Sequence, residues 1–292
     1  MKGYYIEMLK TPSKLDMPVL LVNFPLRVHN TVINNVLMEK YRGVSYEYDI
    51  AYRQFMELYS ELTEQGALVY ILPSTGNFQD QTYVANLGCY LPHIEEDTIM
   101  LANFKSEPRK GEEKFGLAFF MQMGYTIYRP HGTFEGEADL KYLRDNIYVG
   151  GYGIRTERRS YEWMMNEVGG NIITVEMNDP KLYHFDCVFL PLTSNEALVA
   201  TSALKPSDLR KLEHYVDIIS VPEQFVHDAW TNGVVFDKEV LHIEINRESD
   251  KAFRNLMIKH GYEPVLIDMS EFDKSAAAIS CFVMHLNYGT RG

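Results

Sequence analysis

One arrangement recurs five times along this chain and constrains its fold more than any other feature. A stretch with the apolar spacing of a helix ends, and an apolar strand follows at once. The helix ends fall near residues 66, 124, 169, 215 and 261, so successive ends are 58, 45, 46 and 46 residues apart. Units of similar length that each carry a helix and strands predict a closed or solenoidal α/β array. A plain α/β sheet with evenly sized units is the alternative.

Glycine marks four of the five helix ends, because it readily adopts the left-handed conformation that closes a helix. After the first helix, Gly66 is followed by the strand-like segment "ALVYILP". The fourth helix lacks this glycine, and we predict Ser207 as its N-cap. The predicted helices span residues 46–65, 112–123, 161–168, 207–215 and 249–260.

Each unit also contains a second predicted strand. These strands lie in "DTIMLANF", "NIYVGGY", "CVFLPL", "VVFDKEVLHIEI" and "CFVMHL". A closed array brings the same part of every unit to a central axis, so the polar residues that precede these strands become neighbours. They include Asp80, Glu135, His184, Asp228 and Cys281. Acids, a histidine and a cysteine that converge in one cleft predict a chemical site.

Composition excludes several classes of partner. The formal net charge is −12, which argues against nucleic acid and anionic membranes and is compatible with a cationic small molecule. Three cysteines without CxxC spacing indicate a reducing compartment, and we expect a cytoplasmic protein. No apolar run reaches the length of about 18 residues that a membrane helix needs. The nine histidines show no HExxH pattern, so no metal site is predicted.

Two residues could carry nucleophilic and proton-transfer chemistry. Cys281 follows small residues in "KSAAAISCFVMHL" and becomes a nucleophile if a cation or a histidine lowers its pKa. His184 and Asp186 in "LYHFDCVFLPL" have strand spacing, so both side chains face the same way. A histidine there can protonate a leaving amine and then deprotonate water. A buried structural cysteine and a core histidine are the alternatives.

Several acids and amides could bind a planar cation. Glu135 and Asp139 lie in "TFEGEADLKYL", where Gly136 permits a bend that presents Glu135. Asp80 and Asn86 stand at the two ends of a strand-like apolar run in "DQTYVANLGCY". Carboxylates bind a guanidinium through paired hydrogen bonds. Solvated loops and ordinary turn residues are the alternatives.

Two further residues complete the candidate set. Asn23 lies in "LLVNFP", and Arg155 follows a glycine-rich turn in "GGYGIRTE". An arginine in that place suits a carboxylate, although such arginines also form surface ion pairs.

Five segments, "DQTYVAN", "FEGEADL", "GGYGIRTE", "LYHFDCVFLPL" and "SEFDKSAAAISC", resemble the guanidino-group-modifying enzymes of the pentein superfamily. They occur in that family's order and extend from about residue 20 to the end of the chain. The resemblance implies a five-bladed α/β propeller with pseudo-five-fold repeats, forming a single catalytic domain over residues 1–292.

The resemblance also implies roles for the candidate residues. Cys281 attacks the guanidinium carbon and forms a covalent thiouronium, and His184 is the general acid and base. Glu135 and Asp80 hold the guanidinium, Asp186 assists, and Asp139 belongs to the same set of substrate-binding acids. The expected partner is a small guanidino substrate, and neither a metal nor an organic cofactor is needed.

Asn86 directs the resemblance toward one branch of the superfamily. The segment "VANLG" is similar to that of the arginine dihydrolases, in which the matched asparagine serves a second hydrolytic round. Asn23 and Arg155 also match that branch, and Arg155 is expected to bind the substrate carboxylate. The implied reaction converts arginine and two waters into ornithine, ammonia and carbon dioxide. Arginine deiminase and dimethylarginine dimethylaminohydrolase, which form citrulline, are the alternatives.

Two departures from the family pattern affect the expected activity. Ala276, Ala277 and Ala278 replace the glycines that usually precede the cysteine, and added methyl groups restrict the backbone there. Ala138 replaces a glycine in the run that begins at Glu135. These changes keep open a different guanidino substrate, or a non-catalytic propeller that binds arginine.

Overall fold

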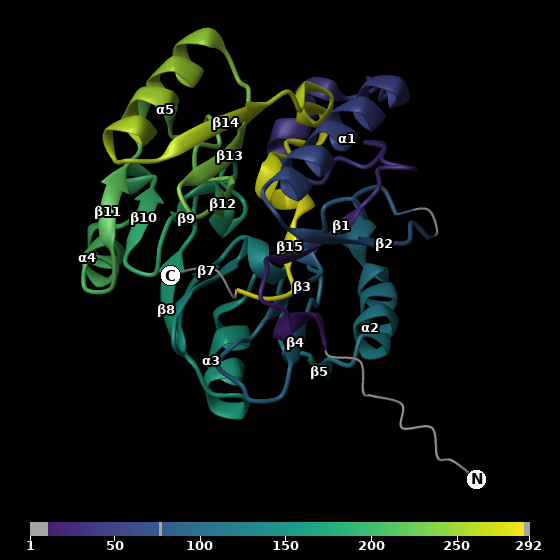
Figure 1. The fold of residues 1–292 in the computed structure, drawn as a ribbon, viewed down its shortest axis with the longest axis vertical. Helices are drawn as coiled ribbons and strands as arrows, with labels where there is room; N and C mark the ends of the chain where they lie inside the picture. The colour runs from purple at the N-terminus through teal and green to yellow at the C-terminus, as the bar shows by residue number, and fades with distance from the viewer. Residues whose placement is uncertain (1–10, 76–77, 289–292) are drawn as a thin grey trace.

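Five three-stranded sheets surround a common centre in the part of the chain that the structure describes, residues 11–75 and 78–288 of a computed structural model (Figure 1). In every sheet the middle strand pairs antiparallel with an inner strand and parallel with an outer strand. A helix joins the middle strand to the outer one, because parallel neighbours need a crossover connection.

The bounds of the elements show the repeat. The middle strands are β1 (Val19–Asn23), β4 (Thr98–Leu101), β7 (Ile147–Tyr152), β10 (Glu196–Val199) and β13 (Glu239–Ile243). The helices are α1 (Tyr48–Glu64), α2 (Glu112–Gln122), α3 (Arg158–Glu167), α4 (Pro206–Leu212) and α5 (Arg247–Lys259). The outer strands are β2 (Leu68–Leu72), β5 (Thr126–Tyr128), β8 (Asn171–Glu176), β11 (Asp217–Ser220) and β14 (Glu263–Ile267). The inner strands are β3 (Gly88–Tyr90), β6 (Leu140–Arg144), β9 (Phe189–Pro191), β12 (Val234–Phe236) and β15 (Met284–His285).

The last strand closes the ring. β15 pairs with β1, with Leu20 opposite His285 and Leu21 opposite Met284. The inner strand of the first sheet therefore comes from the other end of the chain. This pairing confirms the predicted closed α/β array and its five units.

The predicted helices are present, with shifted ends. α3 begins at Arg158, three residues before the predicted start. Ser207 is not an N-cap, because α4 begins at Pro206 and Lys205 takes the cap position. Proline is favoured at the first helical position, where its missing N–H is not needed. The four glycines at predicted helix ends, Gly66, Gly124, Gly169 and Gly261, all have positive φ.

Three predicted strands differ from the structure. The run from Tyr83 to Ala85 is not a strand, because Val84–Asn86 form a 3-10 turn, η3, and β3 begins at Gly88. "VVFDKEVLHIEI" is a hairpin of β12 and β13 that reverses near Asp237, whose φ is 50°. Most of "CFVMHL" lies outside β15, since Ile279–Phe282 form another 3-10 turn, η10. Short buried apolar runs do not distinguish strands from tight turns by periodicity.

These 3-10 turns bring distant segments together at the centre. η5 (Gly136–Ala138) precedes β6 and η6 (Phe185–Cys187) precedes β9, as η3 and η10 precede their inner strands. The turn η3 contacts both η5 and η10. Gly136 permits this approach, since its φ is 70° and an added Cβ would lie 2.6 Å from the carbonyl carbon of Asn86. No helix within the described residues is long and apolar enough to cross a membrane.

Candidate active site

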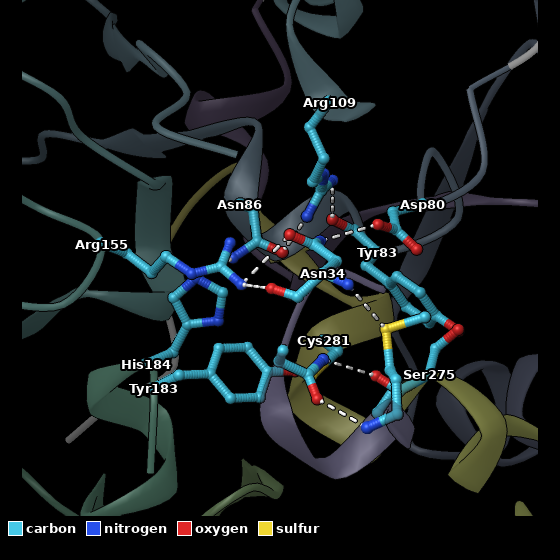
Figure 2. Close-up of a pocket in the computed structure, with 13 residues that line it drawn as sticks. Asn34, Asp80, Tyr83, Asn86, Arg109, Arg155, Tyr183, His184, Ser275 and Cys281 are labelled. Carbon is cyan, nitrogen blue, oxygen red and sulfur yellow. Dashed lines mark hydrogen bonds between the residues drawn. The ribbon is translucent and has the colours of Figure 1, made fainter. Parts of the chain in front are cut away.

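A narrow cavity lies among the central turns (Figure 2). Its lining residues are Asn34, Asn35, Met38, Asp80, Tyr83, Asn86, Arg109, Arg155, Tyr183, His184, Ser275, Ala277 and Cys281. The free volume is about 20 Å³, which is room for about one water molecule. A ligand the size of an amino acid therefore enters only when lining side chains move.

Cys281 lies on η10 with its side chain buried. Its Sγ is 3.6 Å from Nδ2 and 3.7 Å from Oδ1 of Asn232. Burial, together with the negative charge of the nearby Asp186, raises the pKa of the Cys281 thiol to about 12. The thiol is therefore protonated at neutral pH while the cavity is empty, and a bound cation would favour its ionisation.

The raised pKa predicts slow, strongly pH-dependent alkylation of the free protein. Because only the thiolate reacts, the rate of Cys281 modification by iodoacetamide should rise about tenfold per pH unit, or about 1,000-fold from pH 7 to 10. Mass spectrometry of the Cys281 peptide measures this rate, and Cys281→Ser supplies the unmodified control. A rate that levels off below pH 9 would contradict the raised pKa.

Glu135 connects His184 to Arg155. One carboxylate oxygen, Oε2, lies 2.7 Å from His184 Nε2 and 3.1 Å from Arg155 Nη1. The other oxygen accepts hydrogen bonds from the backbone N–H groups of Lys105 and Ser106. Burial opposes ionisation, but the His184 hydrogen bond and the charge of Arg155 hold the pKa of Glu135 at about 2. Glu135 is therefore a fixed negative charge beside the histidine.

Asp80 leaves one buried carboxylate oxygen without a partner among the described residues. Its Oδ2 accepts hydrogen bonds from Asn34 Nδ2 at 2.9 Å and from Gln79 Nε2 at 3.2 Å, while Oδ1 has none. Burial raises the pKa of Asp80, and the positive charge of Arg109 opposes that rise. A buried acceptor without a donor is costly, so a donor-rich cation bound here would be stabilised.

Asn86 is oriented by Arg109, which binds its amide oxygen, while its amide nitrogen lies near His184. Arg109 donates from Nη1 to Asn86 Oδ1, and Arg109 is itself paired with Glu112 at 2.7 Å. Because a guanidinium only donates, the amide NH₂ of Asn86 is turned toward His184, with Nδ2 3.3 Å from Nε2. A neutral amide therefore stands next to the histidine.

Asn34 lines the cavity and is hydrogen-bonded to residues from several segments around it. Its backbone carbonyl accepts a hydrogen bond from Arg155 at 2.6 Å, and its side chain bonds to Asp80 (Figure 2). Its Oδ1 also accepts from the Ser106 hydroxyl at 2.7 Å. These bonds join three units of the ring beside the cavity, which Asn34 and Arg155 both line.

The structure places five of the predicted site residues around the cavity: Cys281, His184, Asp80, Asn86 and Arg155. Glu135 does not line the cavity but is hydrogen-bonded to His184 and Arg155, and Asn23 lies elsewhere. Asn23 ends β1, and its amide donates to the Leu72 carbonyl at 2.8 Å. It lines a separate hollow beside Ser74 and fixes the pairing of β1 with its neighbour. Asn34, and not Asn23, lines the cavity.

The remaining predicted acids lie behind or beside the cavity wall. Asp139 accepts hydrogen bonds from Thr156 Oγ1 at 2.6 Å and from the Phe185 N–H at 3.0 Å, so it supports the turn after His184. Asp186 accepts from the Ser280 hydroxyl at 2.7 Å, next to Cys281 in the chain. Asp228 lines a neighbouring cavity, and Asn232 of the same unit approaches Cys281 instead.

Sequence reasoning missed several lining residues: Asn34, Asn35, Met38, Arg109, Tyr83, Tyr183 and Ser275. Tyr183 adjoins His184 and could have been found from its place in the motif. Asn34 and Arg109 lie in polar segments that carry no pattern of their own. The described residues contain no group of three or more histidine, cysteine or acidic side chains arranged to hold a metal ion.

The closed five-unit fold and this cysteine–histidine–carboxylate arrangement define the pentein class. Within that class, a family model described as "N,N dimethylarginine dimethylhydrolase, eukaryotic" matches residues 23–287. The match covers most of the chain, so the protein belongs to this family.

Curated relatives have two different activities in their names. A bifunctional arginine dihydrolase/ornithine cyclodeaminase, AgrE, from Nostoc sp. (strain PCC 7120) is 27% identical over 250 residues. That alignment covers 83% of this chain but only 34% of the relative, so the chain spans about a third of that protein. An N(G),N(G)-dimethylarginine dimethylaminohydrolase from Mycobacterium tuberculosis is 23% identical over 239 residues, covering 82% of this chain and 76% of the relative.

Solved structures agree in fold. The N-terminal domain of ArgZ, a cyanobacterial arginine dihydrolase bound to substrate, superposes with a TM-score of 0.84 at 22% identity. The alignment covers 92% of this chain and 98% of that one. A dimethylarginine dimethylaminohydrolase adduct with S-methyl-L-thiocitrulline gives a TM-score of 0.74 at 18% identity, covering 92% and 99% of the two chains.

Proposed function

We propose that this protein hydrolyses the guanidino group of arginine through a covalent intermediate on Cys281, acting as an arginine dihydrolase. The observation that carries the proposal is the convergence of Cys281, His184 and Asp80 in one buried cavity, with Glu135 hydrogen-bonded to His184. A thiol, a proton carrier and two carboxylates are the groups that attack on a guanidinium carbon requires.

Asp80 and Glu135 supply the recognition of the cation. The unpartnered Oδ1 of Asp80 is an acceptor for one N–H group, and Glu135 is a fixed negative charge on the histidine side. A guanidinium held between them places its positive charge in the cavity that contains Cys281. That charge lowers the cost of forming the thiolate, which the empty site disfavours.

His184 serves the proton transfers. The thiolate attacks the guanidinium carbon, and ammonia leaves after receiving a proton from His184. His184 then removes a proton from water, which attacks the thiouronium carbon and frees the cysteine. The hydrogen bond to Glu135 at 2.7 Å orients the imidazole.

Asn86 supports the dihydrolase reaction over a deiminase reaction. Its neutral amide faces His184 and the backbone carbonyl of Glu135, to which Nδ2 donates at 3.4 Å. A carboxylate in this place would add a third acid beside Asp80 and Glu135. An amide instead leaves a donor that can hold the oxygen of a ureido group for a second attack by the Cys281 thiolate. A second ammonia leaves, water releases the carbamate of ornithine, and the carbamate decomposes, so the overall products are ornithine, two ammonia molecules and one carbon dioxide.

Arg155 is assigned to the carboxylate of the substrate. In the empty site its guanidinium is bound to Glu135 and to the Asn34 carbonyl. Substrate binding would exchange these contacts for a carboxylate and release Glu135 and Asn34. The proposed reaction requires no metal and no organic cofactor.

A citrulline-forming activity is the second candidate. It is favoured by the family match, whose description names dimethylarginine as the substrate of that family. Incubation of the purified protein with arginine, followed by amino-acid analysis, distinguishes the two. Ornithine formed without added enzymes supports the dihydrolase. Citrulline as the end product contradicts the dihydrolase and supports the second candidate.

Asn86→Asp tests the role assigned to the amide. A carboxylate at residue 86 would pair with Arg109 and remove the donor beside His184. We expect citrulline to accumulate, or turnover to be lost, and ornithine formation to fall by at least about tenfold. Asn232→Asp is not a suitable control because Asn232 contacts Cys281, so Asn195→Asp on an exposed turn serves instead. Unchanged ornithine output from Asn86→Asp would refute the role.

A further inference from the structure

We propose that Tyr183 is a positioning residue for this reaction: its hydroxyl holds the turn that carries Cys281, and its ring holds Arg155 and His184. The inference rests on the proposed function and extends it to a residue that the chemistry itself does not require. Tyr183 is buried and lines the cavity between the nucleophile and the arginine.

Residues 276–278 lead into η10, which carries Cys281, and we call this segment the nucleophile turn. Its backbone is strained at Ala276. Its φ is 56° and its ψ is 42°, the left-handed conformation that side-chain-bearing residues resist. Ala276 lies five residues before Cys281. The surrounding structure must therefore hold the turn in a conformation that alanine does not favour.

Tyr183 supplies one of the bonds that hold this turn. Its hydroxyl donates to the Ala276 carbonyl at 3.2 Å. The preceding residue, Ser275, is held by the Tyr46 hydroxyl at 2.6 Å and by Asn35, which donates to its carbonyl at 3.3 Å. Of these three hydrogen bonds, the one from Tyr183 is made to the strained residue, Ala276. Burial raises the pKa of Tyr183 well above its usual value, so the hydroxyl keeps its proton.

The ring of Tyr183 positions the opposite wall. The Arg155 guanidinium lies over it, with its carbon 5.0 Å from the ring centre. The His184 ring packs against it at a centroid distance of 4.7 Å. Figure 2 shows Tyr183, His184 and Arg155 on the same side of the cavity. A single side chain therefore links the nucleophile turn to the proton carrier and to the arginine.

Tyr183→Phe removes the hydroxyl and keeps the ring, so it tests the contribution of the hydroxyl alone. The ring contacts with Arg155 and His184 remain, so KM for arginine should change by less than about twofold. Loss of one hydrogen bond to the turn should lower kcat by about tenfold. Tyr125→Phe is the matched control, because its buried hydroxyl donates to a backbone carbonyl, that of Leu286, outside the cavity. Tyr125→Phe should leave kcat and KM unchanged.

Ala276→Gly provides a rescue that a merely structural role would not show. Glycine adopts the left-handed conformation without strain, so the turn no longer depends on the tyrosine. In the Tyr183→Phe background, Ala276→Gly should restore kcat to within about threefold of the parent protein. Equal kcat in Tyr183→Phe and the parent, or a deficit that Ala276→Gly does not reduce, would overturn the proposal.

Labelling distinguishes this failure from failure of the proposed function. If the parent protein turns over neither arginine nor methylated arginine, the function is wrong, and the same variants are compared by the rate of Cys281 modification with chloroacetamidine. Slower labelling of Tyr183→Phe than of Tyr125→Phe supports the positioning role without turnover. Equal labelling of the two variants overturns it.

Discussion

Replacing Cys281 with serine should abolish turnover of arginine, with a loss of at least about 1,000-fold in kcat. Serine keeps the size of the side chain, but its hydroxyl ionises far less readily than a thiol. The buried position beside Asp186 disfavours an anion further. Initial rates of ornithine or citrulline formation measure the effect, and intact-protein mass spectrometry should show no covalent adduct on the variant.

Cys187→Ser is the control for this substitution. Cys187 is also a free cysteine near Asp186, with its Sγ 3.6 Å from Oδ1, but it does not line the cavity. The Cys187→Ser variant should keep its activity within about threefold of the parent. Comparable losses in both variants would show that the serine substitutions act through the local structure, and activity retained in Cys281→Ser would refute the nucleophile.

Replacing His184 with alanine should lower kcat by about 100- to 10,000-fold, because one side chain serves both proton transfers. Removal of the imidazole also frees Glu135 Oε2, which then keeps only Arg155 as its side-chain partner. A stronger pairing of these two residues would raise KM by keeping Arg155 from the substrate. Steady-state kinetics separates the loss in kcat from the rise in KM.

His214→Ala is the control for the histidine substitution. His214 is exposed in the turn after α4, and its ring is hydrogen-bonded to the backbone carbonyl of Arg210. The His214→Ala variant should keep kcat and KM unchanged. Thermal unfolding should show that His214→Ala and His184→Ala both remain folded. Near-normal kcat in His184→Ala would refute the role of His184 in the proton transfers.

The repeat was predictable because its signals are local. Helical spacing, a following glycine with positive φ and an apolar strand all depend on residues close in sequence, and the five helices lie where these signals place them. Strand ends were less predictable. The residues of η3 and η10 are mostly apolar and are buried like strand residues, so the local sequence does not distinguish these turns from strands.

Candidate site residues that lie within sequence motifs could be predicted. Residues outside the motifs, which approach the site only because the ring closes, could not. Cys281, His184 and Glu135 stand just before inner strands, so a closed array alone brings them together. Asn34 lies in the connection between β1 and α1, with no strand spacing to place it. Asn23 looked suitable by residue type, but the end of β1 turns its amide to Leu72.

The sequence by itself determined the number of units, the helix in each one and the chemical types available at the centre, because these follow from local spacing and composition. Only the tertiary structure decided which of the available polar residues share the cavity. The pairing of β15 with β1 closes the ring, and residues up to 247 positions apart, Asn34 and Cys281, then line one cavity. Contacts at such separations depend on the register and closure of the sheets, which short-range patterns do not encode.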